Sequence, residues 1–470
     1  MLALRSAPRA YPSLLAVLLL LAATATAARG QSFQPVILDR PGSINFAEGT
    51  GISAAGVAAG YGWELDDYSP RSGLRWPPDF NYAAGEEPQM TGNLASFVFN
   101  GIDPLSDLPF GSAIGPDTGG AVHAIDVDEI APDPLIAGVF FARWTDRHPS
   151  GFSESEILGG VPQFRVGWAT PNSGSLPHIQ MWDTVSGTVY DLHPSGFTYS
   201  KGAAIIGSIT DLHIAGWGEQ SGLERALSWN FDSFGFPATN LHPTGFDSSR
   251  ANGLSSRWTV GSGSPANSGT QHALSFNGAG SATDLNPSWT SYSQALGASE
   301  AGIVGFGGTS LYGRRALYWS AADPNQIVDL HQFLPTDYIS SYATAINDGK
   351  SIVGTAIDSG GERHAVIWRP IHQWSLMFRP GLTRTARLVT AYVTLDKPAP
   401  KGGAVIRLSP TSSTKTYAWS QQKEIVIAEG KTSATFTVAT TETKLLKPVR
   451  ATISATWGTV LRETTLTINP

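Results

Sequence analysis

The chain has 470 residues, enough for one large domain and a second small one. With 51 glycines, 31 prolines and only 15% charged residues it is typical of a turn-rich all-β protein, and 10% aromatic residues exclude a disordered chain. The absence of cysteine excludes disulfides and thiolate metal sites. The formal net charge is −7, but the two parts of the chain differ in sign. From residue 371 onward there are 13 Lys and Arg against 5 Asp and Glu, whereas the part before it has 18 Lys and Arg against 33 Asp and Glu. The acidic main body argues against a nucleic-acid partner.

The N-terminus has the pattern of an export signal. Arg5 and Arg9 precede the apolar run 14–21, and small residues at 23–28 suit cleavage. The run is too short to span a bilayer comfortably, and no second apolar stretch approaches ~20 residues. We therefore expect a signal peptide over 1–28, a secreted, extracellular or cell-envelope location, and no membrane span in the mature chain.

A repeat of 43 to 49 residues organises the middle of the chain, and the unit 166–205 shows it most clearly. Each unit reads as four short strands separated by turn residues. In unit 166–205 the expected strand 178–182 ends in an aromatic residue. Aromatic residues recur at the equivalent position of successive units, at Trp182, Trp229, Phe276, Trp319 and Trp368. A small residue followed by glycine recurs in phase at Val166-Gly167, Ala215-Gly216, Val260-Gly261, Val304-Gly305 and Val353-Gly354.

Weaker copies extend the pattern upstream to seven units. One places Ala137-Gly138 before the strand Phe140–Trp144, and the other leads from Ile52 to Trp76. The insertion 77–136 between them is too long for one unit, so we expect loops or extra strands there. Because the repeat fails in this insertion, it is also where specificity is expected.

Four-stranded units of about 45 residues favour a β-propeller over 31–370, with a linear β-solenoid as the rival. A further strand of each unit ends in an Asp-Leu or Asn-Leu pair, which recurs at Asp191-Leu192, Asn240-Leu241, Asp284-Leu285 and Asp329-Leu330. No such pair follows Trp368, whereas Val36–Ile44 aligns without gaps to Val189–Phe197. The unit missing at the end is thus supplied at the beginning. This predicts a ring of seven blades in which the N-terminal strand closes the last one.

The period stops near Trp374, and a linker is expected at 369–380. Short alternating strands follow over 376–470, which predicts a small immunoglobulin-like β-sandwich. The expected strands are 388–395, 404–408, 423–428, 433–439, 450–456 and 462–468.

Two sets of histidines recur with the repeat. His178, His272 and His364 stand four residues before the aromatic, where other units have Arg225 and Arg315. A ring of imidazoles would suit a metal or an anion, but arginine is not a metal ligand, so a repeated structural donor is the better interpretation.

The second set lies in a His-Pro or equivalent turn: His148, His193, His242 and His331, with Asn286 and Arg40 in the same place. These side chains would form a polar rim on the ring, although proline and glycine explain most of the motif as turn chemistry. Exposed tryptophans at Trp63, Trp76, Trp217 or Trp289 would suit sugar rings, whereas packing between units is the usual role of such residues.

Acidic residues are densest at Asp126, Asp128, Glu129 and Asp133, which are candidate Ca²⁺ ligands. Their spacing lacks the calcium-loop pattern, so we expect a solvated loop, no metal and no cofactor. We find no short catalytic motif, which favours a non-catalytic protein. A carbohydrate-active enzyme remains an alternative if carboxylates converge on one face of the ring, and a structural envelope component is another.

The repeated phrase Ile-Val-Gly, His-Ala-x-x-Trp, Asp-Leu-His-Pro-x-Gly-Phe, best seen in 166–205, 215–254 and 352–368, resembles the bacterial extracellular HAF-type repeats. The resemblance implies a propeller in an exported protein and offers no catalytic residue to carry over. The tail at 393–405 and 428–438 is similar to immunoglobulin-like or Calx-β-like modules. The proteins that carry such repeats are of uncharacterised role. Our own expectation is an exported, non-catalytic binding or surface-interaction protein whose partner is an extracellular glycan or protein.

Overall fold

The computed structural model describes residues 33–38, 40–41, 43–65, 69–78, 86–132, 140–174, 176–232, 235–309, 313–370, 374–378, 382–395, 398–399, 403–410, 417–420, 422–443, 445–457 and 460–470. The expected signal peptide lies outside these ranges. The chain divides into two compact units, 1–369 and 370–470. The described residues form strands with two 3-10 turns, Pro116–Thr118 and Leu330–Phe333, and no α-helix, which confirms the all-β prediction. None of the described segments is a helix long and apolar enough to cross a membrane.

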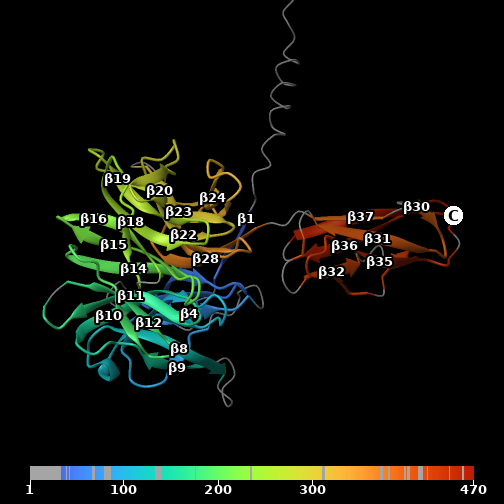
Figure 1. Cartoon of the computed structure of the whole chain (residues 1–470). Helices are drawn as coiled ribbons and strands as arrows, with labels where there is room; N and C mark the ends of the chain where they lie inside the picture. The colour runs from blue at the N-terminus through green and yellow to red at the C-terminus, as the bar shows by residue number, and fades with distance from the viewer. Residues whose placement is uncertain are drawn as a thin grey trace, which may run out of the picture. The chain divides into compact units, whose positions relative to one another are not determined.

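The described part of the first unit contains seven small sheets, coloured from blue to orange in Figure 1. In chain order they are β2(Phe46–Ile52) to β4(Ser72–Trp76) through β3(Ala58–Trp63); β6(Ser96–Ile102), β7(Pro109–Ile114), β8(His123–Pro132), β9(Phe140–Asp146) and the added β5(Gln89–Met90); β10(Phe152–Gly160), β11(Phe164–Pro171), β12(His178–Asp183) and β13(Val189–Asp191); β14(Tyr199–Ile206), β15(His213–Gln220), β16(Leu223–Asn230) and β17(Ala238–Asn240); β18(Phe246–Leu254), β19(Thr259–Pro265), β20(His272–Gly278) and β21(Ser281–Asp284); β22(Tyr292–Ser299), β23(Gly302–Gly308), β24(Arg315–Ser320) and β25(Ile327–Asp329); and β26(Tyr338–Ile346), β27(Ile352–Asp358), β28(Arg363–Pro370) and β1(Phe33–Ile37).

The glycine of each repeat stands where the second strand of a sheet closely approaches the backbone of the first strand, with which it pairs. A Cβ added at Gly167 would lie 1.9 Å from the carbonyl oxygen of Glu156, which no side chain tolerates. The same approach, at 1.9 to 2.1 Å, occurs at Gly60, Gly111, Gly216, Gly261, Gly305 and Gly354. Just beyond it every first strand has a β-bulge, which increases its twist.

The series of sheets closes on itself. The first strands contact one another in order from β2 through β6, β10, β14, β18 and β22 to β26, and β26 contacts β2. Across this seam Thr344 donates a hydrogen bond to the carbonyl oxygen of Gly49 at 2.8 Å, and the Asn347 amide donates to that of Ser53 at 2.9 Å. In addition, β1 pairs with β28, so the N-terminal segment completes the last sheet (Figure 1).

The register of β1 corrects the gap-free alignment of the N-terminus. The backbone N–H of Leu38 donates to Ala365 at 2.9 Å, as that of Leu192 donates to Ile179 at 3.2 Å. Leu38 therefore matches Leu192 and not Asp191, one residue away from the prediction. Arg40 consequently does not take the histidine position and instead forms an ion pair with Glu362 at 3.3 Å.

The insertion 77–136 contributes strands to a sheet of the series, and this corrects the assignment of Phe140–Trp144. That segment is the fourth strand, β9, whereas β8 is the third and begins at His123. The second strand is β7, identified by Gly111. Position 127 of β8 is valine where other units have an aromatic, and the doublet Ala137-Gly138 lies outside the described residues. The landmarks predicted for this one unit are therefore on the wrong strands, whereas Gly60 and Trp76 of the preceding unit stand where the repeat places them.

The repeated tryptophans tie neighbouring sheets together. Trp182, Trp229, Trp319 and Trp368 are buried, and their indole N–H groups donate to backbone carbonyl oxygens in the turn that precedes their own sheet, at Arg147, Leu192, Leu285 and Leu330. Trp63 and Trp76 are also buried, which removes them as exposed sugar platforms. Packing is therefore the role of this set.

The second unit has two sheets that share one apolar core. One contains β29(Trp374–Phe378), β31(Leu388–Leu395), β35(Ser433–Thr440) and β33(Ala418–Trp419). The other contains β30(Leu382–Arg384), β37(Val460–Asn469), β36(Val449–Trp457), β32(Ala404–Pro410) and β34(Glu424–Ile427). Val393 and Phe436 of the first sheet belong to the same core as Ile427 and Ile453 of the second. Because β29 pairs with β31, the expected linker 369–380 is partly a strand.

Candidate functional site

The turn histidines join each sheet to the next through a unit that we call the histidine latch. In the clearest example the His193 backbone N–H donates to Asp191 at 2.9 Å, and its Nδ1 accepts from the Ser200 hydroxyl at 2.7 Å. Its Nε2–H donates to the Phe197 carbonyl at 3.1 Å. Ser200 in turn accepts from the backbone N–H of Ile179 at 3.1 Å, so the latch connects β12 to the first strand of the following sheet.

The latch recurs with substitutions that preserve its hydrogen bonds. His148 with Ser155, His242 with Ser249 and His331 with Ser341 repeat the Nδ1 contact at 2.8 to 2.9 Å. Asn286 replaces the imidazole by placing Oδ1 at 2.6 Å from the Ser293 hydroxyl. An amide that satisfies the same partners indicates a structural link, and the serine seven residues after His148, His193, His242 and Asn286 is a sequence signal that could have revealed it.

Burial lowers the pKa of His193 below its ordinary value, and it does the same for the pKa of His148, His242 and His331. A positively charged neighbour lowers the pKa of two of them further: Arg225 acts on His242, and Arg315 acts on His331. The neutral imidazole is the form that fits the latch, because Nδ1 accepts while Nε2 donates. The proposed rim set is thus half-buried in the links between sheets; His193 also lines a shallow pocket of about 470 Å³.

The strand histidines pair with a carboxylate of the fourth strand. His178 Nδ1 lies 3.0 Å from Asp191, and His272 Nδ1 lies 2.7 Å from Asp284. Arg315 makes the equivalent contact with Asp329 at 2.6 Å. His123, which the sequence interpretation missed, pairs with Asp146 at 2.8 Å and stacks on His148 at 3.8 Å between ring centroids. Each imidazole has its own carboxylate, so these side chains do not gather into a metal ring.

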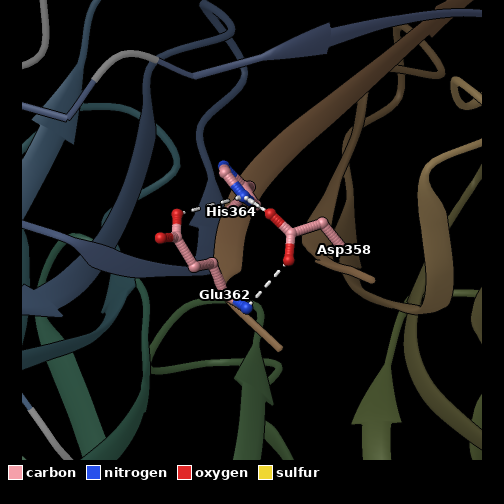
Figure 2. A group of neighbouring side chains, drawn as sticks. All are labelled: Asp358, Glu362 and His364. Carbon is pink, nitrogen blue, oxygen red and sulfur yellow. Dashed lines mark hydrogen bonds and ion pairs between the residues drawn. The ribbon is translucent and has the colours of Figure 1, made fainter. Parts of the chain in front are cut away.

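The sheet that contains β1 differs, because Ile37 precedes Leu38 where the other fourth strands have Asp or Asn. There His364 turns Nε2 toward Asp358 at 2.9 Å and toward Glu362 at 3.9 Å (Figure 2). These three residues form the one group among the described residues whose ligand atoms all lie within 4.8 Å. Histidine nitrogen and carboxylate oxygen are suitable ligands for a divalent cation.

The protein itself already satisfies this group. Asp358 Oδ1 accepts backbone N–H groups of Gly360 and Glu362 at 2.9 Å each, and Glu362 Oε2 bonds Arg40. A cation would displace both Arg40 and the His364 proton. We therefore interpret Asp358 and Glu362 as the partners of His364 in place of the aspartate that other fourth strands provide.

The predicted calcium ligands are not brought together. Asp126 is buried and pairs with Arg165 at 2.7 Å, Asp128 accepts from the Thr145 hydroxyl at 2.7 Å, and Glu129 pairs with Arg143 at 3.4 Å. Asp133 lies outside the described residues. Asp126 belongs instead to a buried ion cluster with Asp103, which lies 3.3 Å from the same arginine.

A cavity of about 680 Å³ opens where the hairpins between first and second strands converge, and we call it the central cavity. Six of the seven sheets contribute to its wall. The wall includes Ile52, Ile206, Asp211, His213, Leu254, Ser256, Arg257, Trp258, Glu300, Ile346, Asn347 and Asp348. Pro104 is its one contributor from the insertion 77–136 among the described residues.

Hydrogen bonds link these hairpins to one another. The Ser256 hydroxyl donates to Glu300 at 2.7 Å, and the Glu300 backbone N–H donates to Asp348 at 3.1 Å. The Asn347 side-chain amide donates to the carbonyl oxygen of Ser53, and the backbone N–H of Ala54 donates to that of Pro104 at 3.0 Å. The wall is thus connected over five hairpins, which gives a pre-formed cavity and not a set of independent loops.

Of the remaining aromatic candidates, Trp289 is 47% exposed and lies in the turn before β22. Trp217 is half-buried, with the Arg250 guanidinium 5.3 Å from its ring. Neither residue lines the central cavity. Trp258, in the hairpin between β18 and β19, does. Comparison with protein-family models gives no match, and comparison with curated protein sequences gives none either.

Proposed function

We propose that this chain is an exported, non-catalytic binding protein built on a seven-bladed β-propeller, with HAF-type repeats and a C-terminal immunoglobulin-like sandwich. The observation that supports it is the central cavity. Its walls come from segments as distant as Ile52 and Asp348, so closure of the sheet series creates it. Its volume falls within the ~300–1,000 Å³ of typical ligand sites.

The proposed function places the protein outside the cell or in its envelope, where its ligand is a glycan or a protein. The experiment is an array of extracellular glycans and proteins probed with the purified exported chain. A saturable ligand is expected. Failure to bind any arrayed glycan or protein would overturn the proposal in favour of a purely structural envelope component.

A second candidate is a carbohydrate-active enzyme, because Asp211, Glu300 and Asp348 line the same cavity. Glycoside hydrolysis needs one carboxyl group as acid and another as base or nucleophile. Release of reducing sugar from an arrayed glycan, lost in Glu300→Gln, would support the enzyme. Glycan binding without release favours the binding protein.

A further inference from the structure

The floor of the central cavity is an aliphatic collar. Ile52, Ile206, Leu254 and Ile346 are the last residues of β2, β14, β18 and β26, and all four line the cavity. Ile52 and Ile346 are buried, whereas Ile206 and Leu254 are half-buried and present apolar surface to it. A ligand therefore meets hydrocarbon at depth.

The rim above this collar is anionic. Asp211, Glu300 and Asp348 are exposed and come from three different hairpins. Within the described residues neither Glu300 nor Asp348 has a Lys or Arg nitrogen within 4 Å, and Asp211 contacts only the His213 imidazole at 2.9 Å. Other carboxylates of this unit do have an arginine partner, as Glu48 has Arg363 and Glu224 has Arg250.

The single guanidinium of the rim does not neutralise these groups. Arg257 stacks on Trp258 at 4.5 Å and forms no ion pair with a described carboxylate. Three carboxylates thus face one arginine around a concave surface, which concentrates negative potential there. The three carboxylates are too widely spaced to share one metal ion, because they do not form a group within 4.8 Å.

An apolar floor beneath separated carboxylates matches a long aliphatic chain that ends in a cation. Lysine and arginine side chains have this form, with an apolar stem and a charged head. We propose that the central cavity binds a polypeptide segment through a basic side chain, its stem against the collar and its cation between Glu300 and Asp348. This inference rests on the proposed binding function and names the chemistry of its ligand.

The test is selection of random dodecapeptides on the full exported chain, followed by titration of a labelled selected peptide. We expect enrichment of Lys or Arg, and an affinity loss of at least tenfold when that residue becomes norleucine, which keeps the stem without the charge. The double variant Glu300→Gln/Asp348→Asn should lose at least tenfold as well. Glu154→Gln/Glu219→Gln, which changes net charge equally at the opposite ends of the sheets, should bind normally.

The outcomes separate this inference from the proposed function. Peptides that bind the double variant normally but fail to bind Ser256→Trp, which fills the cavity, would overturn the basic-side-chain inference and keep a binding cavity. Selection of no peptide would also overturn it, and the glycan array then decides the proposed function. Equal competition by 1,5-diaminopentane would show a free amine ligand and overturn the polypeptide.

Discussion

The hydroxyl of Thr344 donates a hydrogen bond of 2.8 Å to the carbonyl oxygen of Gly49, although the two residues stand 295 positions apart. The same contact occurs between neighbouring sheets inside the series, where Thr50 donates to Phe99 at 2.7 Å. The seam between the last sheet and the first therefore resembles an ordinary contact between sheets.

Thr344→Val should cost about 1 kcal/mol of unfolding free energy, because it removes one intramolecular hydrogen bond with little change of shape. Thr50→Val should cost the same. Urea unfolding of both variants checks this. If Thr50→Val were destabilised and Thr344→Val were as stable as the unaltered chain, the first and last sheets would not be joined in solution.

Removal of residues 31–45 should lower the melting temperature strongly. It deletes β1, exposes the edge of β28 and removes the buried side chains of Phe33 and Leu38. Calorimetry of the truncated and intact mature chains gives the comparison. Equal melting temperatures would contradict closure by the N-terminal strand.

The histidine latches predict loss of stability in acid. Burial lowers the pKa of His193 in the folded chain, so the unfolded chain takes up protons more readily. Stability present at neutral pH is therefore lost as pH falls through about 6.5 toward the lowered folded pKa. Replacing His148, His193, His242 and His331 by asparagine, as in the natural Asn286 latch, should flatten this dependence.

The measurement is urea unfolding at about pH 7.5 and pH 5.5, chosen on either side of the ordinary histidine pKa. His213→Asn is the control, because His213 begins β15 and takes no part in a latch. The control should keep the pH dependence that the latches produce. An unaltered slope in the fourfold variant would rule out the latches as its source.

Arg165→Met should destabilise the first unit by about 3–5 kcal/mol, because it leaves the buried Asp103 carboxylate without a cationic partner among the described residues and leaves Asp126 with Arg147 alone, at 3.3 Å. Arg143→Met is the matched control. Its ion pair with Glu129 is exposed and should be worth less than about 1 kcal/mol. Similar losses in the two variants would contradict the buried cluster.

The repeat was visible in the sequence because its landmarks have steric causes. Gly167 and its equivalents must lack a side chain where the backbones of two paired strands approach closely, and Trp182 and its equivalents fill the space between sheets. The strands of the tail, such as 388–395, were also predictable from alternation. The unit around β8 was misassigned because Val127 breaks the aromatic landmark.

The central cavity could not be predicted in this way. Asp211, Arg257, Glu300 and Asp348 lie in hairpins that share no residue pattern, and only closure of the sheets brings them to one cavity. The histidine sets were attractive because they repeat, yet repetition reflects a link that every sheet needs. Residues specific to this protein lie where the repeat places no constraint.

Calorimetric titration of an array-selected ligand into two tryptophan variants tests the central claim most directly. Ser256→Trp fills the central cavity, whereas Ser268→Trp places the same ring at the opposite end of β19, in an exposed hairpin. We predict that Ser256→Trp abolishes binding and that Ser268→Trp binds like the unaltered chain. Unchanged binding by Ser256→Trp would contradict recognition through the cavity.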